Sequence, residues 1–254
     1  MSWLSHAILG ALQGFTEFLP VSSTGHMAAL GLIFDIKTEG LALQASLHLG
    51  TLASVVWLYR EDLRRFLVLP WSPTTRREAR LLAIAIAATI PLAVALRPLD
   101  ERALTNPALL ATGFFVTTGL LLATRFLVRG HRTWPSDVGA ALVGLAQGLA
   151  TFPGLSRSGA TVGMGLALGL EPRGAARFSF LLSIPAIVAA SALTLAEGGY
   201  RQLAPGPWLL GMFASAAFGA LSIRWVQDTL DQARLWTFAA YTAAVALFLL
   251  FLQP

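Results

Sequence analysis

Six apolar stretches dominate this chain of 254 residues, and each is long enough to cross a membrane. A helix needs roughly 20 residues to span the hydrocarbon core. We place the expected spans near Leu41–Tyr59, Leu81–Leu99, Pro107–Val128, Phe178–Ala196, Trp208–Val226 and Trp236–Leu252. Only 12% of the residues are charged, against about 25% in an ordinary soluble domain. The sequence therefore predicts an all-α polytopic membrane protein, with residues 1–254 forming a single integral membrane domain.

Residue usage excludes several function classes. The chain contains no cysteine, which excludes disulfides, thiolate catalysis and cysteine metal sites. The net charge of +5 comes mainly from arginines. These lie between the apolar runs, so we assign them to membrane topology and not to nucleic-acid binding. The opening segment MSWLSHAILGAL lacks a basic n-region, and no convincing small-residue cleavage site follows it, so we expect it to stay in the protein.

Two polar segments interrupt the apolar pattern. The first, QGFTEFLPVSSTGHM, begins at Gln13, and the second, QGLATFPGLSRSGATVGM, begins at Gln147. The apolar runs around them are broken into lengths of about 10–14 residues, which suit a re-entrant segment better than a span. The two segments also match at a constant offset of 134 (147 − 13), which pairs Gly14 with Gly148, Phe18 with Phe152, Ser22 with Ser156 and Gly25 with Gly159.

This offset predicts two repeats, about residues 1–132 and 133–254. Each repeat is expected to hold a re-entrant helical hairpin followed by three transmembrane helices. Because three is an odd number of spans, the second repeat must be inverted relative to the first, and the two hairpin tips can meet near the midplane. Inverted repeats with broken helices around a central site are common in transporters.

Arginine distribution sets the expected orientation. One side receives the loop 60–80, Arg125–Arg132, Arg173–Arg177 and Arg224–Arg234, and the other side receives Lys37, Arg97, Arg102 and Arg201. The richer side is expected to be cytoplasmic. Both termini and the entry to the first hairpin then face outward.

Glu17 is a carboxylate in a membrane segment, where a charged side chain is costly and usually functional. It could hold a hard divalent cation, act as an acid or base, or form a structural ion pair with Arg157. Arg157 lies at the expected start of the second half-helix, and its guanidinium suits phosphate oxygens. The ion pair and the phosphate contact are compatible, because a phosphate or a metal can sit between the two side chains.

The hydroxyls of the first segment, on Ser22, Ser23 and Thr24, are expected at the start of a half-helix. Capping explains one of them, and the free N–H groups of a helix start also bind anions. Ser23 and His26 are spaced i, i+3 and can share one face of a turn, which is the arrangement of an activated nucleophile. A lone histidine in a bundle is, however, more often only hydrogen-bonded. Together these groups predict a midplane pocket for phosphate, and because lipid surrounds it, the expected substrate is a phosphorylated lipid.

The two motifs also carry a family resemblance. QGFTEFLPVSSTGH and PGLSRSGAT, in this order and at this separation, resemble the paired signatures of the undecaprenyl-diphosphatase family of the bacitracin-resistance type. The resemblance covers essentially the whole chain, including LHLGTLASVVWLYRED and FSFLLSIPA. It implies hydrolysis of undecaprenyl diphosphate to undecaprenyl phosphate and inorganic phosphate, aided by a divalent cation, Mg or Ca. It also implies recycling of the lipid carrier for wall polymers in the bacterial cytoplasmic (inner) membrane.

Site residues follow from the same resemblance. It implies catalytic roles for Glu17, Ser23, His26 and Arg157, with Glu17 also as the metal ligand. Substrate contacts are expected from Gln13, Ser22, Thr24, Gly25, Ser156, Ser158, Gly159 and Thr161. Gln13 occupies a position where some members carry Glu, and because an amide cannot serve as an acid or base, a paired-carboxylate mechanism is not expected. Gln13 could still ligate a cation through its carbonyl oxygen, or only bridge the hairpin.

The expected mechanism docks the terminal phosphate on Arg157, with Ser23 attacking in line and His26 as the base, before water cleaves the phosphoserine. Direct attack by water and attack by Thr24 are the alternatives. Rival functions are a transporter or flippase of phosphorylated polyprenyl lipid and a non-catalytic lipid-binding protein. The sequence does not fix the oligomeric state, and a homodimer is compatible with it.

Overall fold

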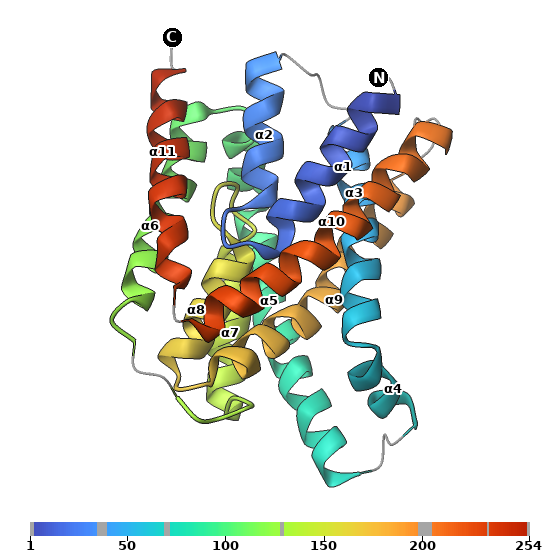
Figure 1. The fold of residues 1–254 in the computed structure, drawn as a ribbon, viewed down its shortest axis with the longest axis vertical. Helices are drawn as coiled ribbons and strands as arrows, with labels where there is room; N and C mark the ends of the chain where they lie inside the picture. The colour runs from blue at the N-terminus through green and yellow to red at the C-terminus, as the bar shows by residue number, and fades with distance from the viewer. Residues whose placement is uncertain are drawn as a thin grey trace.

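The computed structural model describes residues 3–34, 40–68, 72–127, 130–197, 205–232 and 234–252, which form a bundle of helices (Figure 1). In chain order these are α1 Trp3–Phe18, α2 Ser23–Phe34, α3 Gly40–Leu58, α4 Arg60–Val68, α5 Pro73–Ala103, α6 Pro107–Thr124, α7 Asp137–Leu149, α8 Arg157–Ala167, α9 Pro172–Ala196, α10 Pro205–Asp231 and α11 Phe238–Phe251. A 3₁₀ turn, Leu235–Thr237, precedes α11.

Four helices are long and apolar enough to cross a membrane, namely α5, α6, α9 and α10. They confirm a polytopic membrane protein and four of the six expected spans. The other two expected spans, Leu41–Tyr59 and Trp236–Leu252, fall on α3 and α11. The described apolar segments there, Leu43–Leu58 and Leu235–Phe251, are shorter. The structure also holds one helix that was not expected, the charged α4 between α3 and α5.

Helix α5 begins well before the expected Leu81 because the sequence there supplies a strong helix start. The Ser72 hydroxyl accepts a hydrogen bond from the Thr75 N–H at 3.1 Å, and Pro73 takes the first helical position. Serine at the cap and proline in the first turn are both favoured. The basic segment that follows is therefore helical and extends α5 beyond its apolar part.

Two hairpins form where the polar segments predicted them, α1 with α2 and α7 with α8. Figure 1 shows that the first opens at the end that carries both termini and the second at the opposite end, with their turns meeting inside the molecule. The turns touch directly, because the Ser158 hydroxyl donates to the Leu19 carbonyl at 2.9 Å. Helix α2 starts at Ser23 and α8 at Arg157, which are separated by the offset found in the sequence, 134 (157 − 23).

Each hairpin packs its first helix tightly on a long helix of the other repeat. A Cβ atom added at Gly10 of α1 would lie 2.1 Å from the Gly211 carbonyl oxygen of α10. One added at Gly144 of α7 would lie 2.1 Å from the Ala85 carbonyl oxygen of α5. Small residues allow such close approach between membrane helices. The two glycines again differ by 134 (144 − 10), which agrees with an internal repeat, whereas the full inverted-repeat relation of the remaining helices stays a prediction.

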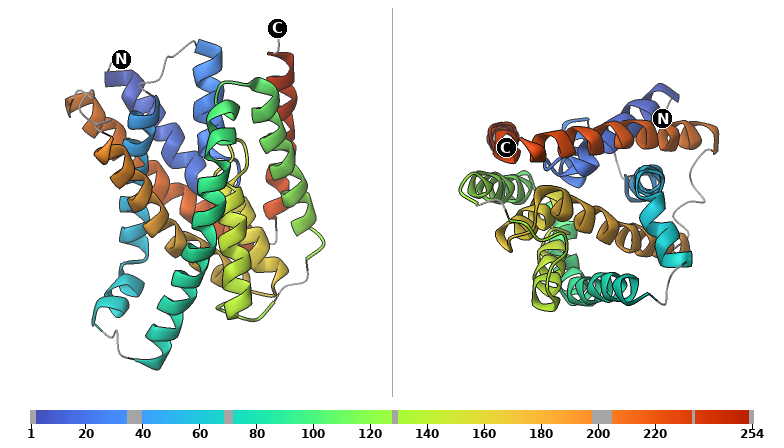
Figure 2. Two further views of the ribbon diagram at one scale, coloured as in Figure 1. Left: turned by 180° about the vertical axis from the view of Figure 1, so that it is seen from behind. Right: turned by 60° about the horizontal axis from the view of Figure 1, so that its bottom comes forward.

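Three of the four charged segments expected on one side contact one another, because Arg177 of α9 pairs with Asp62 of α4 and Arg173 of α9 pairs with Asp231 at the end of α10. Arg80 of α5 pairs with Asp137 at the start of α7 at 2.9 Å, and Arg97 pairs with Glu197 at the far ends of α5 and α9 at 3.5 Å. Figure 2 shows α4 and the start of α5 at the end opposite both termini. Which end faces the cytoplasm stays a prediction. The expected outward residues Lys37 and Arg201 lie outside the described residues.

Candidate active site

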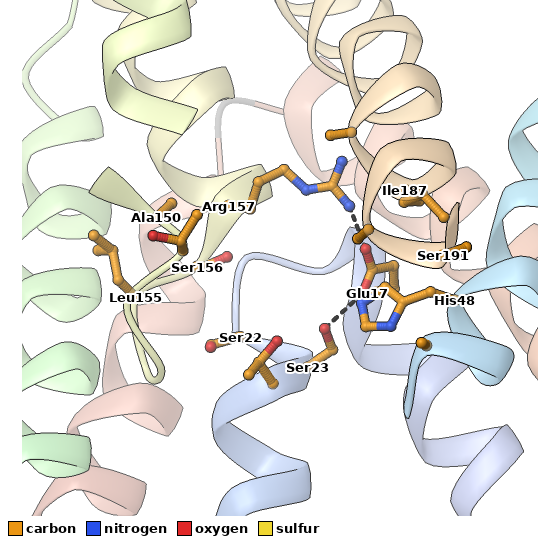
Figure 3. Close-up of a pocket in the computed structure, with 15 residues that line it drawn as sticks. Glu17, Ser22, Ser23, His48, Ala150, Leu155, Ser156, Arg157, Ile187 and Ser191 are labelled. Carbon is orange, nitrogen blue, oxygen red and sulfur yellow. Dashed lines mark hydrogen bonds and ion pairs between the residues drawn. The ribbon is translucent and has the colours of Figure 1, made fainter. Parts of the chain in front are cut away.

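The tips of the two hairpins, together with α3 and α9, enclose a pocket of about 280 Å³ (Figure 3). Six of the residues predicted from the sequence line it: Glu17, Ser22, Ser23, Thr24, Ser156 and Arg157. They come from segments that are more than a hundred residues apart in the chain. The opposed hairpins therefore bring the two motifs together, as the sequence predicted.

Glu17 lies at the centre of this cluster and is only 6% exposed. One carboxylate oxygen, Oε1, pairs with the Arg157 guanidinium, so the expected ion pair forms. The other, Oε2, accepts hydrogen bonds from the Ser23 hydroxyl at 2.6 Å and from the Gln13 side-chain amide at 2.8 Å. Figure 3 marks the contacts to Arg157 and Ser23 with dashed lines. A buried carboxylate is stable only when paired and hydrogen-bonded, and these partners meet that need.

The ion pair with Glu17 occupies only one of the two terminal nitrogens of Arg157. Its side chain is 18% exposed, and Nη2 contacts Glu17. The second terminal nitrogen, Nη1, is buried and has no hydrogen-bond partner among the described residues. A buried donor without an acceptor costs free energy. Arg157 therefore offers a charged donor to an anionic ligand even while it neutralises Glu17.

The two ring nitrogens of His26 have partners other than Ser23, so the structure does not form the expected nucleophile–base pair, and a catalytic role of His26 stays a prediction. The His26 Nδ1 atom lies 2.8 Å from the Ser22 carbonyl oxygen, and Nε2 lies 2.6 Å from the Tyr241 hydroxyl. Because a carbonyl only accepts, Nδ1 carries a proton, and the Nε2 lone pair of a neutral ring then accepts from Tyr241. The spacing i, i+3 allows His26 to meet Ser23, but partners on the loop and on α11 occupy both nitrogens instead.

The contacts of His26 indicate that it stabilises the turn between α1 and α2. Ser22 has φ = +66°, a left-handed conformation that is uncommon for a residue other than glycine. The carbonyl of Ser22 accepts from the His26 ring and also from the His26 backbone N–H at 3.1 Å. His26 and Tyr241 therefore hold the turn that presents Ser23 to the pocket.

Ser158 and Thr161 use their hydroxyls within the fold and do not line the pocket. Ser158 bonds to the first hairpin, as described above, and Thr161 Oγ1 lies 2.6 Å from the Ser179 hydroxyl of α9. Ser156 lines the pocket and also caps α8, accepting from the Gly159 N–H at 3.1 Å. These contacts hold the first turn of α8, which begins at Arg157, in place beside the pocket.

The two predicted glycines serve close packing. A Cβ at Gly25 would lie 2.9 Å from the Gly154 Cα of the second hairpin, and one at Gly159 would lie 3.3 Å from the Pro20 side chain of the first. Neither glycine lines the pocket. Their place in the motifs is explained by the approach of the two hairpin tips.

Three polar residues that line the pocket were not predicted as site residues, His48 of α3, Thr151 of the second hairpin and Ser191 of α9. The His48 Nε2 atom lies 3.3 Å from Glu17 Oε2, and Nδ1 lies 2.8 Å from the Gln44 carbonyl oxygen. A histidine in an otherwise apolar run is a signal that could have found it, because ionisable residues in membrane segments usually mark a site. A single serine such as Ser191 carries no such signal.

Cation binding can be tested against the chemistry of these side chains. Among the described residues, no group of three His, Asp or Glu side chains could hold a metal ion. Hard divalent cations, however, often combine one or two carboxylates with oxygens of a phosphate substrate. Glu17 supplies the carboxylate, and the buried Gln13 Oε1 has no hydrogen-bond partner. These two oxygen donors fit a cation shared with a substrate, not a cage made by protein alone.

Comparisons with known proteins agree over nearly the whole chain. A family model described as "Bacitracin resistance protein BacA" matches residues 6–248. A protein named undecaprenyl-diphosphatase from Desulfatibacillum aliphaticivorans is 35% identical over 264 residues, covering 95% of each chain. One of the same name from Geobacter metallireducens is 35% identical and covers 95% of this chain and 94% of its own. A third, from Carboxydothermus hydrogenoformans, is 33% identical and covers 97% and 95%.

Proposed function

We propose that this chain, which belongs to the bacitracin resistance protein BacA family, hydrolyses undecaprenyl diphosphate to undecaprenyl phosphate and inorganic phosphate. The observation that carries the proposal is the arrangement around Glu17. A guanidinium with a free buried nitrogen and a serine hydroxyl bonded to a carboxylate meet in one pocket. The names of the relatives described above supply the substrate.

Substrate binding begins at Arg157. Its free Nη1 and the N-terminus of α8 receive the terminal phosphate, since both offer N–H donors and positive charge. The Thr24 and Ser156 hydroxyls, which also line the pocket, complete the polar surface. The terminal phosphorus then lies within reach of Ser23.

Ser23 is the proposed nucleophile, and Glu17 replaces His26 as the proton acceptor. The Ser23 hydroxyl already donates to Glu17 Oε2 at 2.6 Å, which is within the distance needed for proton transfer. As the proton moves to Glu17, Ser23 Oγ bonds to the terminal phosphorus and the bond to the bridging oxygen breaks. That oxygen leaves with the lipid phosphate. Water then attacks the phosphoserine, which releases inorganic phosphate and restores Ser23.

A divalent cation belongs to the proposal as a partner of the substrate. Glu17 and Gln13 would hold it, and when bound it would neutralise charge on the phosphates. Arg157 neutralises the same charge from the second hairpin. The homodimer stays a prediction.

The cellular setting follows from the product. Undecaprenyl phosphate is the lipid carrier of wall polymers, so the protein would act in the bacterial cytoplasmic membrane. We propose that the pocket opens to the outer side. In support, the first hairpin opens at the end opposite α4 and the start of α5, which carry many of the arginines, and arginine-rich ends usually face the cytoplasm.

Trapping the phosphoserine tests the mechanism. Substrate labelled on the terminal phosphate is mixed with purified protein and quenched in acid. We expect label on Ser23 in the wild type and none in Ser23→Ala. Rapid turnover without any label on the protein would instead support direct attack by water, with Ser23 only positioning the phosphate.

A further inference from the structure

Helix α9 forms a wall of the pocket that the mechanism above does not use. It contributes Ala186, Ile187, Ala190 and Ser191. Ser191 is only 8% exposed, and its hydroxyl has no hydrogen-bond partner among the described residues. A serine in a helix can bond back to the carbonyl four residues earlier, but this one does not. A buried hydroxyl without a partner is unfavourable, unless a ligand supplies the acceptor.

A second residue that lines the pocket, Arg157, also carries a buried donor without a partner among the described residues, its Nη1 atom. Figure 3 shows Ser191 beside His48 and Ile187, whereas Ser156 and Leu155 lie across the pocket from them. Two residues that line the pocket, on α8 and on α9, therefore each carry an unpaired donor. A diphosphate has two phosphate groups, and the two donors can each serve one of them.

The surroundings of Ser191 identify which phosphate it meets. Its neighbours on the wall are apolar, and Ala190 both lines the pocket and is exposed, so the pocket is open along this part of α9. Val188, on the same turn, is 49% exposed. This side of the pocket thus leads to an apolar surface, which suits a polyprenyl chain. The phosphate attached to that chain must lie next to it.

We propose that Ser191 is a substrate-binding residue that donates a hydrogen bond to the lipid-linked phosphate of the diphosphate substrate. The proposal rests on the proposed function and adds an orientation to it. The terminal phosphate lies at Arg157, the lipid-linked phosphate lies at Ser191, and the chain leaves along α9. After the reaction, Ser191 still holds undecaprenyl phosphate, whereas inorganic phosphate remains with Arg157.

Two isosteric variants test this orientation in the purified protein in detergent. Ser191→Thr keeps the hydroxyl, and Ser191→Val has the same shape without it. Inhibition of hydrolysis is measured with each product separately, undecaprenyl phosphate and inorganic phosphate. We expect the inhibition constant for undecaprenyl phosphate to be about tenfold or more higher in Ser191→Val than in Ser191→Thr, because one hydrogen bond to a charged group is lost. The constant for inorganic phosphate should differ by less than about twofold, because its donors are unchanged.

The control is Ser183→Ala on the same helix. Ser183 is fully buried, donates to the Phe180 carbonyl at 2.6 Å and does not line the pocket, so neither constant should change. Equal constants for undecaprenyl phosphate in Ser191→Thr and Ser191→Val would overturn the proposal. An equal shift for both products would overturn the assignment to the lipid side.

Failure of the proposed function would look different. In that case the wild type would release no phosphate. The two variants, Ser191→Thr and Ser191→Val, can then still be compared by direct binding of undecaprenyl phosphate to the intact protein. The change in tryptophan fluorescence of the protein measures this binding. Weaker binding by Ser191→Val would support the contact, and equal binding would overturn it.

Discussion

Replacing Arg157 tests both of its proposed roles, the ion pair with Glu17 and the contact with phosphate. Its Nη2 atom contacts Glu17, whereas Nη1 has no hydrogen-bond partner among the described residues. Removing one partner of a buried ion pair costs about 3–5 kcal/mol. Glu17 would keep the contacts at Oε2 from Ser23, Gln13 and His48, at 2.6, 2.8 and 3.3 Å. We therefore expect Arg157→Ala to lose about 3 kcal/mol of stability, the lower end of that range, and nearly all turnover.

Arg157→Lys is the more informative change. A lysine keeps the positive charge, but its single ammonium group cannot reproduce the planar fork that meets Glu17 and a phosphate together. If the lysine ammonium pairs with Glu17, the transition state loses one charge-assisted hydrogen bond, which raises the activation free energy by about 1.5–3 kcal/mol. This corresponds to a fall of about 10- to 150-fold in turnover, with stability close to that of the wild type.

Thermal unfolding and phosphate release in the same detergent measure both effects. The double variant Arg157→Ala with Glu17→Ala is compared with Arg157→Ala alone. Removing both charges should recover thermal stability without recovering turnover. Wild-type turnover in Arg157→Lys would refute the phosphate contact. A double variant that regains turnover would show that the pair is only structural.

The remaining predictions concern other residues of the hairpins and the orientation of the chain. Because Tyr241 holds His26 at 2.6 Å, Tyr241→Phe should lower turnover and thermal stability together, and an unchanged variant would contradict the positioning role of His26. Gln13→Glu should keep activity, since a carboxylate can also bind a cation, whereas Gln13→Ala should lose only part of it in a phosphate-release assay; a loss as complete as in Glu17→Ala would contradict this. Single cysteines at Thr74 and Thr105, in this cysteine-free background, should be labelled from the cytoplasmic and the outer side, respectively, and labelling from the same side would contradict the proposed topology.

Much of the site could be predicted because its chemistry lies in two short motifs. The constant offset between them placed Ser23 and Arg157 at equivalent positions, and both are the first residues of half-helices. Local capping and the cost of charge in a membrane were sufficient for that inference. The pairing of Glu17 with Arg157 followed from the same reasoning.

Contacts from distant helices could not be predicted in this way. The partner of His26 is Tyr241, 215 residues later in the chain, and only the packing of α11 brings them together. Spacing along a helix states which residues can meet, but tertiary neighbours decide which of them do. Ser191 was missed for the same reason, since α9 approaches the pocket only in the folded bundle, whereas His48 could have been found as an ionisable residue in an apolar run. The early start of α5 was missed because its first turns are polar and lie outside the apolar pattern.

Product analysis of the purified protein in detergent tests the central claim most directly, because detergent micelles have no two sides between which a lipid could be transported. With undecaprenyl diphosphate as the substrate, we predict release of one inorganic phosphate for each undecaprenyl phosphate formed. Ser23→Ala should lower this release by orders of magnitude while its thermal unfolding stays that of the wild type. A stable wild-type protein that releases no phosphate, yet moves the phosphorylated lipid across liposome membranes, would contradict the account and support a transporter.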